Sequence, residues 1–162
     1  MLIVESGLIV SGANSYVSDA EYVAYASQRG LTIGADDATR EQQLIKAMDL
    51  LESYRDKFKG SKVQRDQPLQ WPRVSVFIDG YQTDSNTLPK ELKRAQMELA
   101  ALSVSVDLAP SGSIENVQSQ SLGELSISYF SGGSYKSVQM DNVMQHLSEL
   151  MVNGGKVRSV RV

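Results

Sequence analysis

The sequence predicts a mainly α-helical protein with a small β component, an α+β fold with a core of about four helices, a β-hairpin and terminal strands or arms. Apolar residues recur at steps of three and four within 38–59 and 89–106, the spacing of one helix face. Between residues 114 and 130 the step changes to two, which is the period of a β-strand. Glycines and prolines separate these segments, as they do at the ends of regular elements.

Length and composition fit one globular domain over residues 1–162. The chain is 41% apolar and 22% charged, which is ordinary for a soluble protein with a core of its own. No run approaches the roughly 18 to 20 apolar residues that a membrane helix needs. The first residues lack the basic region of a secretory signal, so we expect synthesis in a cytoplasm and no contact with membranes.

The first third of the chain predicts short strands followed by two helices. Residues 2–4 and 8–10 have the composition of edge strands. Ser18 and Glu21 have the spacing of a capping box, which predicts a helix over 19–29. The acidic pair at 36–37 then starts a helix over 38–59, whose apolar stripe includes Leu44, Leu51 and Phe58.

Residues 61–87 are predicted to form a long ordered loop. Pro68 and Pro72 forbid a continuous helix, and Asp79-Gly80 is a turn dipeptide. Pro89 then opens a helix over 89–106. A hairpin over 118–130 and a last helix over 141–152 complete the predicted elements.

A basic C-terminal arm is predicted over 153–162, beyond the helix-breaking pair Gly154-Gly155. It carries three positive side chains and no acidic one. Two interpretations remain open: an edge strand that completes the protein's own sheet, or an arm that pairs with a partner by β-augmentation.

A second basic region spans residues 55–73, with six basic side chains against two acidic ones. Together with Trp71 it has the composition of single-strand binders, which combine cations with aromatic stacking surfaces. The alternative is a solvated helix end followed by a packed loop. The net charge of −3 and the pI near 5.2 argue against indiscriminate attraction to phosphate.

No arrangement of residues predicts catalysis, a metal or a cofactor. The chain has no cysteine, and its one histidine, His146, has no second histidine with which to share a metal. No serine lies in a Gly-x-Ser-x-Gly turn, and no glycine loop has the ending that holds phosphate. We therefore expect a protein that is not an enzyme.

Several motifs carry a resemblance that covers nearly the whole chain. They are SYVSDAE at 15–21, YRDKFKG at 54–60, QPLQWPR at 67–73, Leu88-Pro89 before a helix, and the helix residues 93–95 and 98–100. With these motifs the chain resembles a family of tailed-phage and prophage proteins labelled DnaT-like single-stranded DNA-binding proteins. Members look in size and helix order like phage head-to-tail connector (adaptor) proteins, which form twelve-fold rings beneath the portal.

Between these two functions the sequence favours the connector. A ring subunit needs a helical core, projecting loops and terminal arms, whereas a dedicated DNA binder should carry a stronger positive field. The prediction is a structural subunit of the virion neck, in a homo-oligomeric, dodecameric ring that binds the portal and tail or neck proteins. Genomic DNA would pass through this ring without sequence-specific contact. The alternative is a DnaT-like replication protein that binds single-stranded DNA.

The candidate partner-binding residues follow from the loop and the arm. Trp71 is either an anchor of the loop within the subunit or a contact between subunits. The full set is Trp71, Arg73, Lys156, Val157, Arg158, Val160, Arg161 and Val162.

Overall fold

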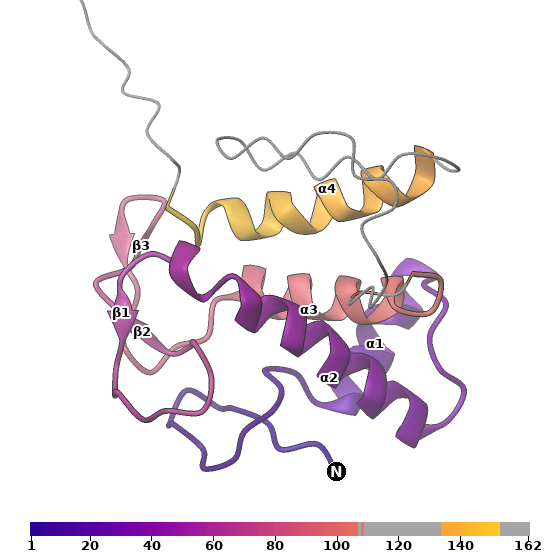
Figure 1. The fold of residues 1–162 in the computed structure, drawn as a ribbon, viewed down its shortest axis with the longest axis horizontal. Coiled ribbons are helices and arrows are strands. Elements are labelled where there is room, and N and C mark those ends of the chain that lie inside the picture. The colour runs from indigo at the N-terminus through magenta and orange to yellow at the C-terminus, as the bar shows by residue number, and fades with distance from the viewer. Residues whose placement is uncertain (107, 109–133, 153–162) are drawn as a thin grey trace, which may run out of the picture.

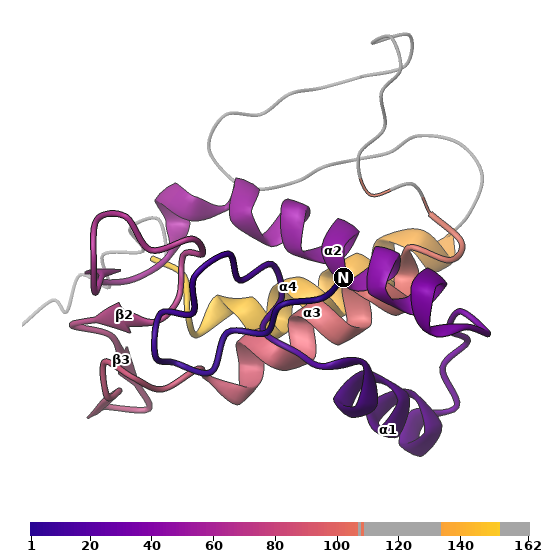
Figure 2. The ribbon, with the colours of Figure 1, turned by 90° about the horizontal axis from the view of Figure 1, so that it is seen from below.

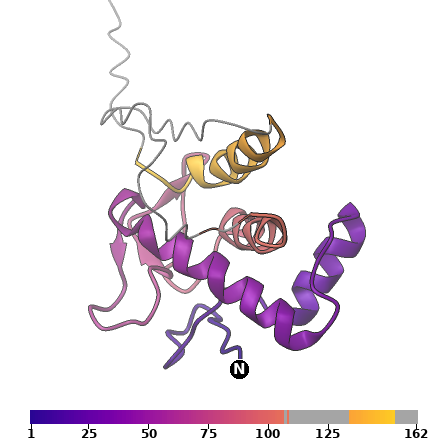
Figure 3. The ribbon, with the colours of Figure 1, turned by 45° about the vertical axis from the view of Figure 1, so that its right-hand side comes forward.

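The fold is α+β, as the sequence predicts. The computed structural model describes residues 1–106, 108 and 134–152. Within these residues it contains four α-helices, one 3₁₀ turn and two small antiparallel hairpins. Helix α3 (Lys90–Leu102) lies between α2 (Asp37–Ser53) and α4 (Ser134–Ser148), as Figures 1 and 3 show, and α1 (Asp19–Arg29) lies at one end. None of these helices is long and apolar enough to cross a membrane.

Helix α1 has the predicted bounds because local signals set both of its ends. The Ser18 hydroxyl accepts from the Glu21 amide, and the Glu21 carboxylate accepts from the Ser18 amide at 2.9 Å. Burial acts to raise the pKa of the Glu21 carboxyl, but the hydrogen bonds it accepts from Ser18 and from the Lys93 ammonium group lower that pKa below its usual value. Gly30 ends the helix in the left-handed conformation, with φ 63°.

Helix α2 ends at Ser53, six residues before the predicted end. A 3₁₀ turn, η1 (Arg55–Lys57), follows it, and Phe58 is extended. Phe58 remains in the core, as its place on the apolar stripe predicts. It lies outside the helix, however, and pairs with Met151 in an isolated antiparallel bridge. Contacts to distant residues therefore override the helical periodicity of this segment.

The other helices also differ from prediction at their ends. Pro89 is the N-cap of α3, which stops at Leu102 and continues as turns to Val106 instead of as a helix. Helix α4 begins at Ser134 rather than 141 and ends at Ser148 rather than 152. The predicted hairpin over 118–130 and the arm over 153–162 lie outside the described residues.

Residues 2–10 form an irregular loop where edge strands are predicted. Val4 makes a single parallel bridge with Ser15. The buried Glu5 carboxylate accepts from the amides of Gly7, Ile9 and Val10 at 2.8 to 2.9 Å. These amides therefore have a side-chain acceptor and need no neighbouring strand.

The segment 61–87 contains two hairpins. Strands β1 (Ser61–Lys62) and β2 (Arg73–Val74) form the first, and β3 (Phe77–Ile78) and β4 (Tyr81–Gln82) the second. Asp79 and Gly80 have φ values of 52° and 84°, the two positive values that a type I′ turn requires. Figures 1 and 2 both show these strands at one end of the molecule, opposite α1.

A buried glutamine joins the N-terminal segment to the helices. Gln96 on α3 is fully buried, and its Oε1 accepts from the Tyr16 amide at 2.9 Å. Its Nε2 donates to Ser15 Oγ at 2.8 Å and to the Leu44 carbonyl at 3.1 Å. All of its polar atoms are thus paired inside the core, as a buried amide requires.

We expect Gln96→Leu to lower the free energy of unfolding by about 2 kcal/mol, because it leaves buried partners such as the Tyr16 amide unsatisfied. Urea denaturation followed by circular dichroism measures this change. Gln42→Leu, at an exposed position on α2, is the control and should stay within about 0.5 kcal/mol of wild type. Equal stability of the two variants would show that the Gln96 hydrogen bonds do not hold the fold.

Candidate nucleic-acid interface

Trp71 lies in the interior and offers no surface for stacking. Its side chain is 0% exposed and packs edge-to-face on Phe58, with ring centroids 6.1 Å apart. Its backbone amide donates to the Tyr16 hydroxyl at 3.0 Å, and the Trp71–Pro72 peptide bond is cis. Among the described residues the indole Nε1 has no hydrogen-bond acceptor. In this fold Trp71 is an anchor of the segment before β2.

Arg73, at the start of β2, is also largely buried, with 6% of its surface exposed. Its Nε donates to the Lys59 carbonyl and its Nη2 to the Gly60 carbonyl, both at 2.8 Å, with a longer contact to the Phe58 carbonyl at 3.4 Å. Burial lowers the pKa of the guanidinium, while Tyr16 and Glu52 act in the opposite direction. Arg73 therefore binds the backbone that leaves α2.

These hydrogen bonds fix the position of β1 against β2. Gly60 permits the close approach, since a Cβ built there would lie 2.1 Å from the Val74 carbonyl oxygen. Glu52 adds a second link, because its Oε1 accepts from the Gln70 amide at 3.0 Å and from the Tyr16 hydroxyl at 3.2 Å. The chain from η1 to β2 is thus held to α2 at several points.

Five basic side chains extend from this framework, and we call them the cationic surface. Three are exposed, and Arg55 has only a long contact of 3.8 Å to Asp56. The two others are half-buried: Lys59 Nζ donates to the Glu149 carbonyl at 2.7 Å and Lys62 Nζ to the Gln67 carbonyl at 3.1 Å. A carbonyl carries no formal charge, so these two contacts do not pair either lysine with an acidic group. The cationic surface consists of Arg55, Lys57, Lys59, Lys62 and Arg65.

Charge is strongly segregated along the chain. Residues 55–73 carry six basic and two acidic side chains, and residues 156–162 carry three basic and none acidic. The remainder holds seven basic and seventeen acidic side chains. The net charge of −3 is therefore the sum of two basic segments and an acidic remainder, and it does not reflect the positive field at the cationic surface.

The last described residues lie beside the cationic surface. The Val152 amide donates to the Lys57 carbonyl at 2.8 Å, and the Lys59 amide donates to the Leu150 carbonyl at 2.9 Å. The sequence that follows Val152 contains the remaining candidate residues, which lie outside the described residues: Lys156, Val157, Arg158, Val160, Arg161 and Val162.

Two exposed aromatic side chains, Phe77 and Tyr81, lie on the β3–β4 hairpin and are absent from the sequence-based candidates. They are 53% and 80% exposed. The signal that could have identified them is the Asp79-Gly80 turn, which predicts a hairpin, combined with alternation that places Val76 inside and Phe77 outside.

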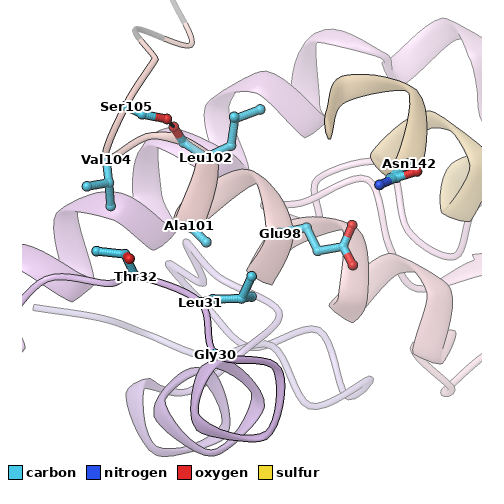
Figure 4. A pocket seen from close by; sticks show the side chains of 9 residues that line it. All are labelled: Gly30, Leu31, Thr32, Glu98, Ala101, Leu102, Val104, Ser105 and Asn142. Atoms are coloured by element: carbon cyan, nitrogen blue, oxygen red, sulfur yellow. Dashed lines mark hydrogen bonds between the residues drawn. The ribbon is translucent and has the colours of Figure 1, made fainter. Parts of the chain in front are cut away.

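A groove of about 560 Å³ on the opposite part of the molecule is a second candidate. Figure 4 shows Glu98 of α3 and Asn142 of α4 at one end of it, and Val104 and Ser105 at the other. The Glu98 carboxylate accepts from the Tyr25 hydroxyl at 2.9 Å and lies 3.3 Å from His146 Nε2. Burial, together with Glu98, raises the pKa of Tyr25 to about 12. An acidic group in this groove does not favour a phosphate.

We expect Arg73→Met to lower the free energy of unfolding by about 3 kcal/mol, because the carbonyls after α2 lose their buried donor. Chemical denaturation measures the loss. Arg65→Met removes the same charge from an exposed position and should cost less than about 0.5 kcal/mol. If Arg73→Met is as stable as Arg65→Met, the guanidinium does not hold this end of the fold.

Comparison with known proteins corrects the predicted function. A family model described as "Putative DnaT-like ssDNA binding protein" matches residues 1–162. Neither the search of curated proteins nor that of solved structures found a match.

The prediction of a head-to-tail connector is wrong, because the family is named for single-stranded DNA binding and nothing in the comparisons indicates a portal, a tail partner or a twelve-fold ring. That prediction gave too much weight to the net charge. Because the match spans all 162 residues, the chain belongs to the DnaT-like ssDNA-binding family.

Proposed function

We propose that the protein binds single-stranded DNA at the end of the molecule that carries the cationic surface. The observation that carries the proposal is the segregation of charge. Residues 55–73 carry a net charge of +4, and their five basic side chains other than the buried Arg73 form the cationic surface, whereas the chain outside its two basic segments is acidic. Arg73 holds this segment through hydrogen bonds to the Lys59 and Gly60 carbonyls. The family description supports the same function. The proposal is for a binding protein and not an enzyme, because the chain has no cysteine and a single histidine.

The physics of the contact is the release of counterions from phosphate. Each basic side chain that neutralises a phosphate frees a condensed cation, so affinity falls as salt rises, with a slope of about −0.7 per phosphate for single strands. Lys57 and Arg65 are the clearest contributors, because both are exposed. The acidic remainder repels the strand elsewhere, which confines binding to this end.

We expect Lys57→Gln/Arg65→Gln to bind an oligothymidine more weakly and to reduce the slope of log K against log salt by about 1.4, the value for two phosphate contacts. Fluorescence anisotropy at several salt concentrations measures both quantities. The matched control is Arg29→Gln/Lys46→Gln, which removes one arginine and one lysine from exposed positions on α1 and α2.

The control should change the slope by much less, because its two charges lie outside the cationic surface. Equal slopes for the two double variants would mean that net charge alone, and not this surface, sets the affinity. A wild-type protein that binds no oligonucleotide at low salt would refute the proposed function.

A further inference from the structure

We propose that the β3–β4 hairpin is the base-stacking element of this DNA site, with Phe77 and Tyr81 each stacking on an unpaired base. The inference rests on the proposed function and deepens it, because it names the part of the nucleic acid that the hairpin contacts. Phosphate contacts hold any strand, whereas stacking on an aromatic ring requires bases that are not already paired within a duplex.

Exposure distinguishes these two rings from the others. Among the aromatic side chains whose burial the structure describes, Phe77 and Tyr81 are the exposed ones, and the rest are buried or half-buried. A folded protein usually buries such rings or covers them with a partner, because each carries a large apolar surface. A nucleobase that stacks on such a ring covers one of its apolar faces, while the polar edge of the base stays in contact with water.

The hairpin is held in place before any ligand arrives. Val76 is fully buried, Ile78 packs against the core, and the Thr83 amide donates to the Val76 carbonyl at 2.8 Å. The type I′ turn at Asp79-Gly80 closes its tip. Stacking on a preformed hairpin avoids the entropy cost of ordering a loop on binding.

The register of the hairpin separates the two rings. Phe77 pairs with Gln82, and Ile78 pairs with Tyr81. Paired residues share a face and successive residues alternate, so Phe77 and Tyr81 lie on opposite faces of the hairpin. Each ring is therefore a separate surface for one base, and both should contribute to affinity.

The cationic surface lies next to the hairpin. The backbone of Gly60, between Lys59 and Lys62 in the sequence, packs against residues 74–76, which lead directly into β3. A strand whose phosphates contact the lysines would therefore have its bases within reach of the hairpin. Single-strand binders use the same combination of cations that contact the phosphates and aromatic rings that stack on the bases.

The test measures the affinity of the full-length protein for an oligothymidine of about 16 nucleotides and for a duplex of the same length. We expect Phe77→Ala and Tyr81→Ala each to weaken oligothymidine binding about 5- to 150-fold, the range for loss of one stacked base. The salt slope should not change, because no charge is removed. Duplex binding should change little.

Two controls separate stacking from damage to the fold. Tyr81→Phe keeps the ring and should bind oligothymidine like wild type. Leu8→Ala truncates another exposed apolar side chain and should have no effect. Unfolding curves for all the variants confirm that the hairpin substitutions leave the core intact.

Binding of oligothymidine by Phe77→Ala and Tyr81→Ala as tight as wild type would overturn the stacking role while leaving the proposed function standing. A loss that is equal for single strands and duplex, or one that changes the salt slope, would also overturn it. Failure of the wild-type protein to bind any oligonucleotide would overturn the proposed function itself.

Discussion

The arrangement of this end of the molecule depends on one buried cation. Arg73 donates to the carbonyl groups of Lys59 and Gly60, which follow α2. A guanidinium can do this because its donors form a planar fork, whereas an ammonium group concentrates its charge at one point. The cost of burying the charge is offset by these hydrogen bonds. Through them β2 is joined to the residues that carry the cationic surface.

A second set of polar contacts connects the same region to the rest of the core. Tyr16 accepts from the Trp71 amide and donates to Glu52, so the N-terminal segment, α2 and the segment before β2 meet at one hydroxyl. Burial, with Glu52 nearby, raises the pKa of Tyr16, and the hydroxyl stays neutral. Gln96 makes a similar junction on α3. These buried hydrogen bonds hold the framework from which the cationic surface and the two hairpin rings extend. A surface that is formed before binding costs less entropy when a ligand binds.

The sequence predicts best where local chemistry determines structure. Helix α1 has the expected bounds because its cap and its glycine are adjacent in the chain. Helix α2 ends earlier than its periodicity predicts, since Phe58 leaves the helix to bridge Met151, a contact that no local pattern reveals. For Trp71 the sequence left open a loop anchor, a contact between subunits and a stacking surface, because the prolines beside it restrict its backbone but do not determine its burial. The strands of the β3–β4 hairpin are two residues long, too short for alternation alone to predict Phe77 and Tyr81 without the Asp79-Gly80 turn beside them.

The central claim, that single-stranded DNA binds at the cationic surface and the adjacent hairpin, is tested most directly by nuclear magnetic resonance. Amide chemical shifts of the isotope-labelled protein would be followed while an oligothymidine is added at low salt. We predict that the largest changes fall in residues 55–66 and 75–82, with little change around Gly30 to Thr32 and the groove beside Glu98. Changes centred on that groove, or no changes at all, would contradict the account.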